Sequence, residues 1–146
     1  MLFKSNGKIL LCSEYLVLEG AKAIALPSKL TQDLKVTKCQ NEIIEWQSFD
    51  ENNDLWFEEK FYFNGNDLKY DSKKNKTSEK ILLLFKFLLK TKDVNDILGN
   101  KFLTKLNFKR EWGLGTSSTF VNNLAKWAKT DPVSYTHLRA HETRTY

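Results

Sequence analysis

Apolar residues in the first 63 positions recur in short runs bounded by polar turns, which is the pattern typical of β-strands. Residues 3–12 form the first predicted strand, and Gly7 within it indicates a bulge or a close backbone approach. Residues 9–12 are apolar at every position, so this part of the strand is predicted to be buried on both faces. Further strands are predicted over 30–39, 43–49 and 55–63.

Polar segments and a proline indicate how these strands connect. Residues 40–42 predict a hairpin loop between the strands on either side of them. Pro27 ends the apolar run 23–26, and residues 50–54 and 64–67 have the composition of turns. The first part of the chain is therefore predicted to form a mostly antiparallel sheet.

The spacing of apolar residues becomes helical after residue 76. Thr77, Ser78 and Glu79 predict a helix start with a hydroxyl cap, and apolar residues up to position 89 follow at helical spacing. A short helix over 94–98, a strand over 102–110 and a helix over 119–129 complete the pattern. This order predicts an α+β fold with helices on one side of a mainly antiparallel sheet.

A glycine-rich stretch, 111–119 (EWGLGTSST), separates the last predicted strand from the last predicted helix. Gly113 and Gly115 allow a tight turn and a close approach of the backbone to a ligand. Thr116, Ser117 and Ser118 lie where the helix would begin. The unpaired N–H groups and the positive dipole end of a helix start favour a phosphate there.

The stretch is neither a Walker A loop, because no lysine follows the second glycine, nor a dinucleotide fingerprint, because the glycine spacing differs. Taken locally, an ordinary helix cap after a tight turn explains it equally well. Three successive hydroxyls favour the phosphate, since a cap needs one oxygen whereas a metal-bound triphosphate uses several.

Composition and charge restrict the class of protein. The chain has 146 residues, 41% apolar and 28% charged, with a net charge of +5, which is typical of a globular domain and suits an anionic ligand. Cys12 and Cys39 lack metal-ligand spacing and lie in apolar runs, so we expect reduced thiols in a cytoplasmic protein, with Cys12 as a small core residue. Neither a membrane-length apolar run nor a signal peptide is present.

The last fifteen residues, 132–146, lack any apolar period and resemble a translated adapter sequence. They contain both histidines, His137 and His141, for which a catalytic or metal-binding role is therefore not expected. We expect residues 1–131 to form one native domain, residues 132–146 to be a non-native tail, and the natural protein to continue beyond Asp131.

Two stretches resemble motifs of the GHMP kinases, the family of galactokinase and of homoserine, mevalonate and phosphomevalonate kinases. Residues 6–18 (NGKILLCSEYLVL) resemble the first motif, although Asn6 replaces its proline and Ser13 its glycine. Residues 113–118 (GLGTSS) resemble the second, phosphate-binding motif, with Thr116 in place of serine and Ser118 in place of alanine. Tyr15 after Glu14 is more similar to the mevalonate and phosphomevalonate branch.

The resemblance implies an N-terminal GHMP kinase domain, whose fold is like the second domain of a small-subunit ribosomal protein. It implies ATP and Mg²⁺ as cofactors and mevalonate or phosphomevalonate as the phosphoryl acceptor. The family's third motif and catalytic aspartate would lie beyond residue 131, so we expect this fragment to be inactive by itself.

The resemblance also implies roles for individual residues. Lys8 would lie near the acceptor and offset charge on the transferred phosphoryl group, and Glu14 and Tyr15 would line the acceptor pocket. Ser117 would ligate Mg²⁺. The ATP phosphates would bind to Gly113, Leu114, Gly115, Thr116, Ser117 and Ser118.

Two alternatives stay open at this point. The chain is basic and carries aromatic residues among charges, so it could present an RNA-binding surface around Trp46, Trp56, Lys60 and Tyr62. Its lysines are spread along the chain and no RNA-binding signature is present, so we expect a small-molecule substrate and neither a nucleic acid nor a membrane as partner. The other alternative is a kinase relative that has lost catalysis. The pattern leaves the oligomeric state open.

Overall fold

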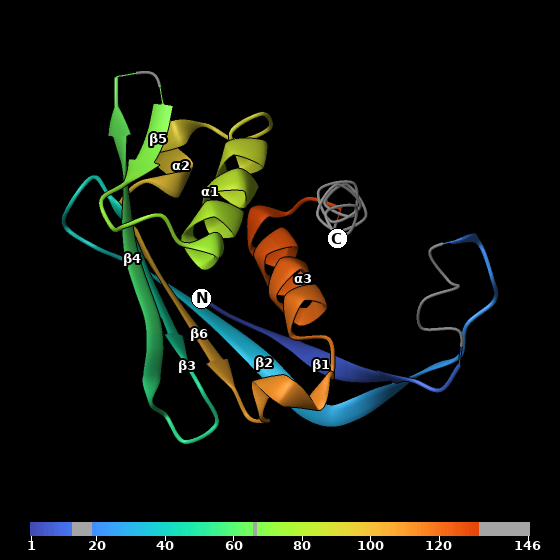
Figure 1. The fold of residues 1–146 in the computed structure, drawn as a ribbon. Helices are drawn as coiled ribbons and strands as arrows, with labels where there is room; N and C mark the ends of the chain where they lie inside the picture. The colour runs from blue at the N-terminus through green and yellow to red at the C-terminus, as the bar shows by residue number, and fades with distance from the viewer. Residues whose placement is uncertain (13–18, 66, 132–146) are drawn as a thin grey trace.

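The computed structural model describes residues 1–12, 19–65 and 67–131 and contains a twisted sheet (Figure 1). The sheet has six strands in the order β1-β2-β6-β3-β4-β5. All neighbouring strands are antiparallel except β3 and β6, which are parallel. The strands are β1 (Leu2–Leu10), β2 (Ala25–Lys38), β3 (Ile44–Phe49), β4 (Leu55–Asn64), β5 (Asp67–Tyr70) and β6 (Asn100–Leu106).

The described helices all lie on one side of this sheet (Figure 1). They are α1 (Lys76–Leu88), α2 (Val94–Ile97) and α3 (Thr116–Ala128), and a 3-10 turn, η2 (Arg110–Trp112), precedes α3. The structure therefore confirms the α+β class and the placement of the helices. None of the described helices combines the length and the apolar composition needed to cross a membrane.

Aromatic rings fill the space between the sheet, α1 and α3. Trp46 of β3 stacks on Phe102 of β6, with 5.3 Å between ring centroids and 10° between planes. Phe85 of α1 meets both rings edge-on, and Trp127 of α3 meets Phe102 edge-on at 4.8 Å. Aromatic pairs of this kind contribute about 0.5–1.5 kcal/mol each beyond the area they bury. The two longer helices are thus held to the sheet by one aromatic cluster.

The predicted hairpin at residues 40–42 is wrong. β2 and β3 do not pair with each other, because β6 lies between them, antiparallel to β2 and parallel to β3. Phe102, Thr104 and Leu106 of β6 all point into the core, so a strand buried on its inner face occupies the centre of the sheet. The turn composition correctly marked the end of a strand but gave no information on its neighbour.

The prediction that residues 9–12 are buried is also wrong. Beyond a bulge between Asn6 and Lys8, β1 and β2 pair only with each other, because the pairing of β2 with β6 has ended. Here the two strands form an arm that extends from the sheet (Figure 1). Ile9 is 46% exposed, and Cys12, expected in the core, is exposed as a free thiol. No described helix covers residues 9–12. β2 also runs through Pro27, which pairs with Lys8 within the arm.

Element ends shift by a few residues from their predicted positions. The cap of α1 is Asn75, whose side chain accepts from the N–H of Thr77, so the helix begins before the predicted hydroxyl cap. β6 ends at Leu106 because η2 follows, and α3 begins at Thr116. β5, whose four residues pair with the end of β4, had no clear sequence pattern.

Candidate functional site

The part of β1 around Gly7 lies against the loop that precedes α3. The backbone N–H of Lys8 in β1 donates to the carbonyl oxygen of Leu114 at 3.0 Å. A Cβ atom at Gly7 would lie 2.9 Å from Ser28 Oγ and 3.1 Å from the Leu114 carbonyl oxygen. A side chain at position 7 would therefore displace Ser28 Oγ and push against the Leu114 backbone, so glycine suits this close approach.

The loop between η2 and α3 owes its shape to two glycines in the left-handed backbone region. Gly113 has a φ of 66° and Gly115 a φ of 78°, values that other residues rarely adopt. Between them Leu114 is buried against Leu106 and Phe108, which anchors the loop to the end of β6. The alternation of glycine with one apolar residue therefore makes a tight loop that is fixed at its centre.

The first turn of α3 leaves polar groups available for a ligand. Gly115 is the N-cap residue and provides no side-chain cap. Its carbonyl oxygen accepts from Thr119, but among the described residues the N–H groups of Thr116 and Ser117 have no acceptor. The Ser117 side chain is exposed, and those of Thr116 and Ser118 are half-buried. Unpaired N–H groups at the positive end of a helix dipole favour an anion.

The Lys8 side chain extends over the start of the same helix. A Cβ atom at Gly115 would lie 3.4 Å from Lys8 Cγ and 3.6 Å from Lys8 Cε, so the lysine stem passes directly beside this glycine. Among the described residues the Lys8 ammonium group takes part in no hydrogen bond or ion pair. A lysine, two glycines and a helix start thus converge on one place from segments about a hundred residues apart.

The structure describes some of the predicted site residues and not others. Lys8 and residues 113–118 lie together at the junction of β1 with the start of α3. Glu14 and Tyr15, predicted to line an acceptor pocket, lie outside the described residues. A magnesium ion at this junction would find one predicted protein ligand, the exposed hydroxyl of Ser117, and would depend on phosphate oxygens and water for the others.

The aromatic residues of the alternative RNA surface do not form one exposed face. Trp46 is 1% exposed and belongs to the core. Trp56 is covered by the guanidinium group of Arg110, 3.8 Å from its ring centroid. The Tyr62 hydroxyl donates to Asp71 at 2.7 Å, and this hydrogen bond raises the pKa of Tyr62. Because base stacking needs accessible rings, this arrangement weakens the RNA alternative.

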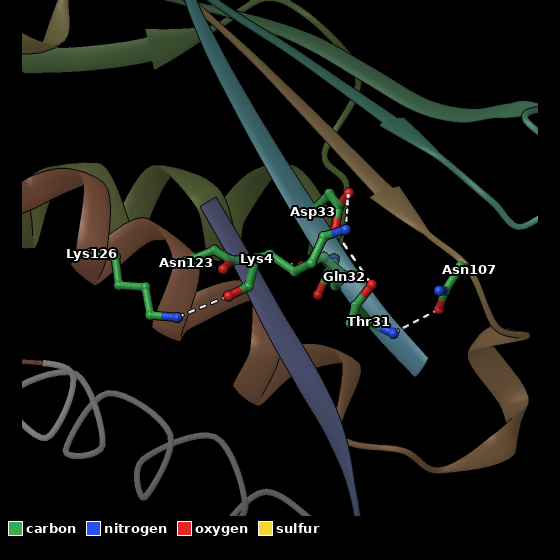
Figure 2. A network of polar contacts seen from close by, with 7 residues as sticks. All are labelled: Lys4, Thr31, Gln32, Asp33, Asn107, Asn123 and Lys126. Carbon is green, nitrogen blue, oxygen red and sulfur yellow. Dashed lines mark hydrogen bonds and ion pairs between the residues drawn. The ribbon is translucent and has the colours of Figure 1, made fainter. Parts of the chain in front are cut away.

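The sequence analysis missed the polar residues that join α3 to the sheet. Thr119 and Asn123 are 4% and 1% exposed, yet both are polar and lie four residues apart on the inner face of the helix. They form hydrogen bonds with β1 and β2. Figure 2 labels Asn123 of α3 and Gln32 of β2 among these residues. Two polar residues at helical spacing within an apolar stripe were the signal that could have revealed them.

Comparisons with known proteins support the fold. Neither a protein-family model nor a curated protein sequence matches the chain. Among solved structures it is similar to a mevalonate diphosphate decarboxylase from Legionella pneumophila, with a TM-score of 0.54, 16% identity and 87% of this chain covered. It is also similar to a "Putative Sugar Kinase" from Campylobacter jejuni, with a TM-score of 0.55, 17% identity and 88% covered.

The chain spans 38% and 39% of the lengths of these two proteins, so the similarity covers less than half of each. At such low identity the similarity concerns the fold alone. The mixed sheet with helices on one side is consistent with the GHMP-kinase-type fold expected from the sequence.

Proposed function

We propose that the chain is part of an ATP-dependent small-molecule kinase. Residues 113–118, which we call the glycine loop, would bind the phosphates of ATP. The observation that carries this proposal is the position of Lys8, which lies beside Gly115 at the uncapped start of α3. A helix start attracts an anion, and a lysine next to it adds a mobile positive charge. One of the two solved neighbours is named as a kinase, which agrees with this chemistry.

Each residue of the site then has a defined task. The N–H groups of Thr116 and Ser117 would donate to phosphate oxygens, and the absence of side chains at Gly113 and Gly115 would let the nucleotide approach the backbone. When bound, Mg²⁺-ATP supplies the phosphoryl group, with the Ser117 hydroxyl as one ligand of the ion. Lys8 would hold the transferred group and its acceptor in line and offset their charge, which is the main contribution a protein makes to phosphoryl transfer.

We infer that the acceptor is mevalonate or phosphomevalonate, contacted by Glu14 and Tyr15. This assignment depends on the residues that follow β1 and on the resemblance of that stretch to the mevalonate branch of the GHMP kinases. One solved neighbour is named for a mevalonate derivative and the other for a sugar, so both acceptor classes belong in an activity test.

The experiment measures Mg²⁺-ATP binding by calorimetry and phosphoryl transfer by product detection, using the protein encoded by an uninterrupted gene. We expect Ser117→Ala to reduce turnover by about 10²-fold or more with little change in thermal stability, because the hydroxyl is exposed and acts on the ion. Thr37→Ala is the matched control, since Thr37 is an exposed hydroxyl on β2 away from the loop.

Three results would contradict the proposal in different ways. Unchanged turnover in Ser117→Ala would remove the magnesium assignment. Binding of Mg²⁺-ATP without transfer to any acceptor would identify a relative that has lost catalysis. Salt-sensitive RNA binding in the absence of ATP binding would favour the RNA alternative.

A further inference from the structure

We propose that a buried hydrogen-bonded layer between α3 and the strands β1 and β2 positions the start of α3 against Lys8, with Asn123 as its central positioning residue. We call this the α3 polar layer, and it consists of Ser5, Gln32, Thr119 and Asn123. As a device for nucleotide binding it rests on the function proposed above. As a device that fixes the glycine loop, it can be tested without any nucleotide.

Asn123 joins the helix to both strands at once. Its Oδ1 atom accepts from Ser5 Oγ of β1 at 2.7 Å, and its Nδ2 group donates to the Gln32 carbonyl oxygen of β2 at 2.7 Å. Ser5 and Gln32 are direct cross-strand partners, so the two contacts lie side by side on the sheet. Asn123 is 1% exposed, so water competes little for these bonds.

Thr119 extends the layer to the glycine loop. Its hydroxyl lies 2.6 Å from Gln32 Oε1 and 2.9 Å from the Thr116 carbonyl oxygen in the first turn of α3. At the other end, Ser5 is three residues before Lys8 on the same strand. The layer therefore connects the two parts of the candidate site, the helix start and the strand that carries the lysine.

Polar contacts at the margin of the layer also hold α3 against β1. The Asn122 side chain donates to Ser5 Oγ at 2.7 Å. Lys126 donates to the Lys4 carbonyl oxygen at 2.8 Å, and Lys4 forms an ion pair with Asp33 at 3.4 Å (Figure 2). These groups tie α3 to the outer edge of β1, whereas its remaining buried residues, Leu124, Ala125, Trp127 and Ala128, pack in the apolar core.

The physical reason for a polar layer is directionality. Apolar contacts tolerate small shifts, but a buried hydrogen bond is lost when its partners shift, and each group left unpaired is costly. An apolar contact at this place would hold α3 on the sheet without fixing its rotation. The hydrogen bonds fix both the rotation of α3 and its position along the strands, and so the direction of its first N–H groups.

The test replaces Asn123 by leucine, which has a similar shape and forms neither hydrogen bond. Thr104→Val is the matched control, because Thr104 is also buried, with 4% of its surface exposed, and donates a side-chain hydrogen bond to Ser48 Oγ at 2.9 Å, between β6 and β3. Both substitutions remove buried polar contacts, but only the first lies in the α3 polar layer. Thr119→Val takes the place of Asn123→Leu if that variant does not fold.

The first measurement is amide hydrogen exchange in the unliganded protein. The Lys8 N–H, bonded to Leu114, reports on the contact between β1 and the glycine loop, and the Gly99 N–H, bonded to Ile43 at 3.0 Å, reports on a remote part of the fold. We expect Asn123→Leu to reduce protection of Lys8 by about tenfold or more relative to Gly99. We expect Thr104→Val to change the two amides equally.

The second measurement is the dissociation constant for Mg²⁺-ATP, which should rise by about tenfold or more in Asn123→Leu and stay within about twofold in Thr104→Val. Equal effects of the two variants on Lys8 protection would overturn the positioning role and leave only a contribution to stability. Absence of nucleotide binding in the unaltered protein would overturn the proposed function, while the exchange experiment would still decide whether the layer positions the loop.

Discussion

At the scale of single residues, the candidate site depends on two glycines and on the lysine that packs between them. At Gly7 another segment occupies the space that a Cβ atom would need. At Gly115 the Lys8 side chain lies in contact with the place where a Cβ atom would be. Lys8 lies between these two contacts, with its backbone bound to Leu114 and its stem beside Gly115. The site thus depends on a close approach at Gly7 and on the left-handed backbone at Gly115, both of which favour glycine.

We therefore expect Gly7→Ala to displace the glycine loop. The added Cβ atom would meet Ser28 Oγ and the Leu114 carbonyl oxygen, and overpacking of this kind costs about 1–3 kcal/mol. The measurement is the NMR chemical shift of the amides in residues 113–118, together with the free energy of unfolding. Gly65→Ala is the control: it costs about 1–2 kcal/mol through its left-handed backbone, but has open space around it and should leave those shifts unchanged.

At the scale of elements, ion pairs and caps fix how helices meet the sheet. Lys86 of α1 contacts both carboxylate oxygens of Asp67 at the start of β5, at 2.8 and 3.1 Å. The hydrogen bond from Lys86 lowers the pKa of Asp67. This contact joins the shortest strand of the sheet to α1, and both partners are accessible to solvent.

The contribution of this pair depends on pH with a defined sign. Because the folded-state pKa of Asp67 is lowered, the stabilisation is fully present above the unfolded-state pKa of about 4 and is lost as pH falls through the lowered value. We expect Asp67→Asn to lower the melting temperature at neutral pH and to match the unaltered protein at about pH 2. Glu51→Gln, for which no ion pair is seen among the described residues, should show no such dependence. A constant difference for Asp67→Asn at every pH would exclude this role.

At the scale of the whole molecule, one aromatic cluster joins the helices to the strands. Phe85 is fully buried and contacts Trp46, Phe61 and Phe102, which come from three strands. It therefore connects α1 to the centre of the sheet, and its loss would leave a cavity at the point where these elements meet.

We expect Phe85→Ala to lower the free energy of unfolding by about 3–5 kcal/mol. Leu83→Ala, on the same helix but 49% exposed, should change it by less than about 1 kcal/mol. Denaturant unfolding followed by Trp fluorescence measures both variants. Similar losses in the two would mean that the cluster does not dominate the stability of the fold.

Much of the fold could be predicted because the spacing of apolar residues indicates which face of a strand or helix is buried. The alternation of Phe102, Thr104 and Leu106 identified the inner face of β6, and the helical spacing of Ile81, Leu84 and others identified α1. The pattern failed at residues 9–12, because an apolar strand is buried only if another element covers it. At residues 9–12 no described helix does so.

The candidate site was predictable in its parts. Gly113, Gly115 and the hydroxyls after them indicated a tight turn at a helix start, and the structure has left-handed glycines followed by the first turn of α3. Their role in binding ATP stays a prediction, as do those of Lys8, Glu14 and Tyr15. The polar layer was not predicted, because Ser5, Gln32 and Asn123 are distant in the chain and individually ordinary.

The sequence by itself determined most of the local conformations: which long segments are strands or helices, and where the glycines bend the backbone. These follow from the preferences of neighbouring residues. Only the tertiary structure decided that β6 lies between β2 and β3, and that Lys8 meets the glycine loop. Such contacts join segments far apart in the chain, and they form because hydrogen bonding and burial in the whole fold select one arrangement among many that the local patterns allow.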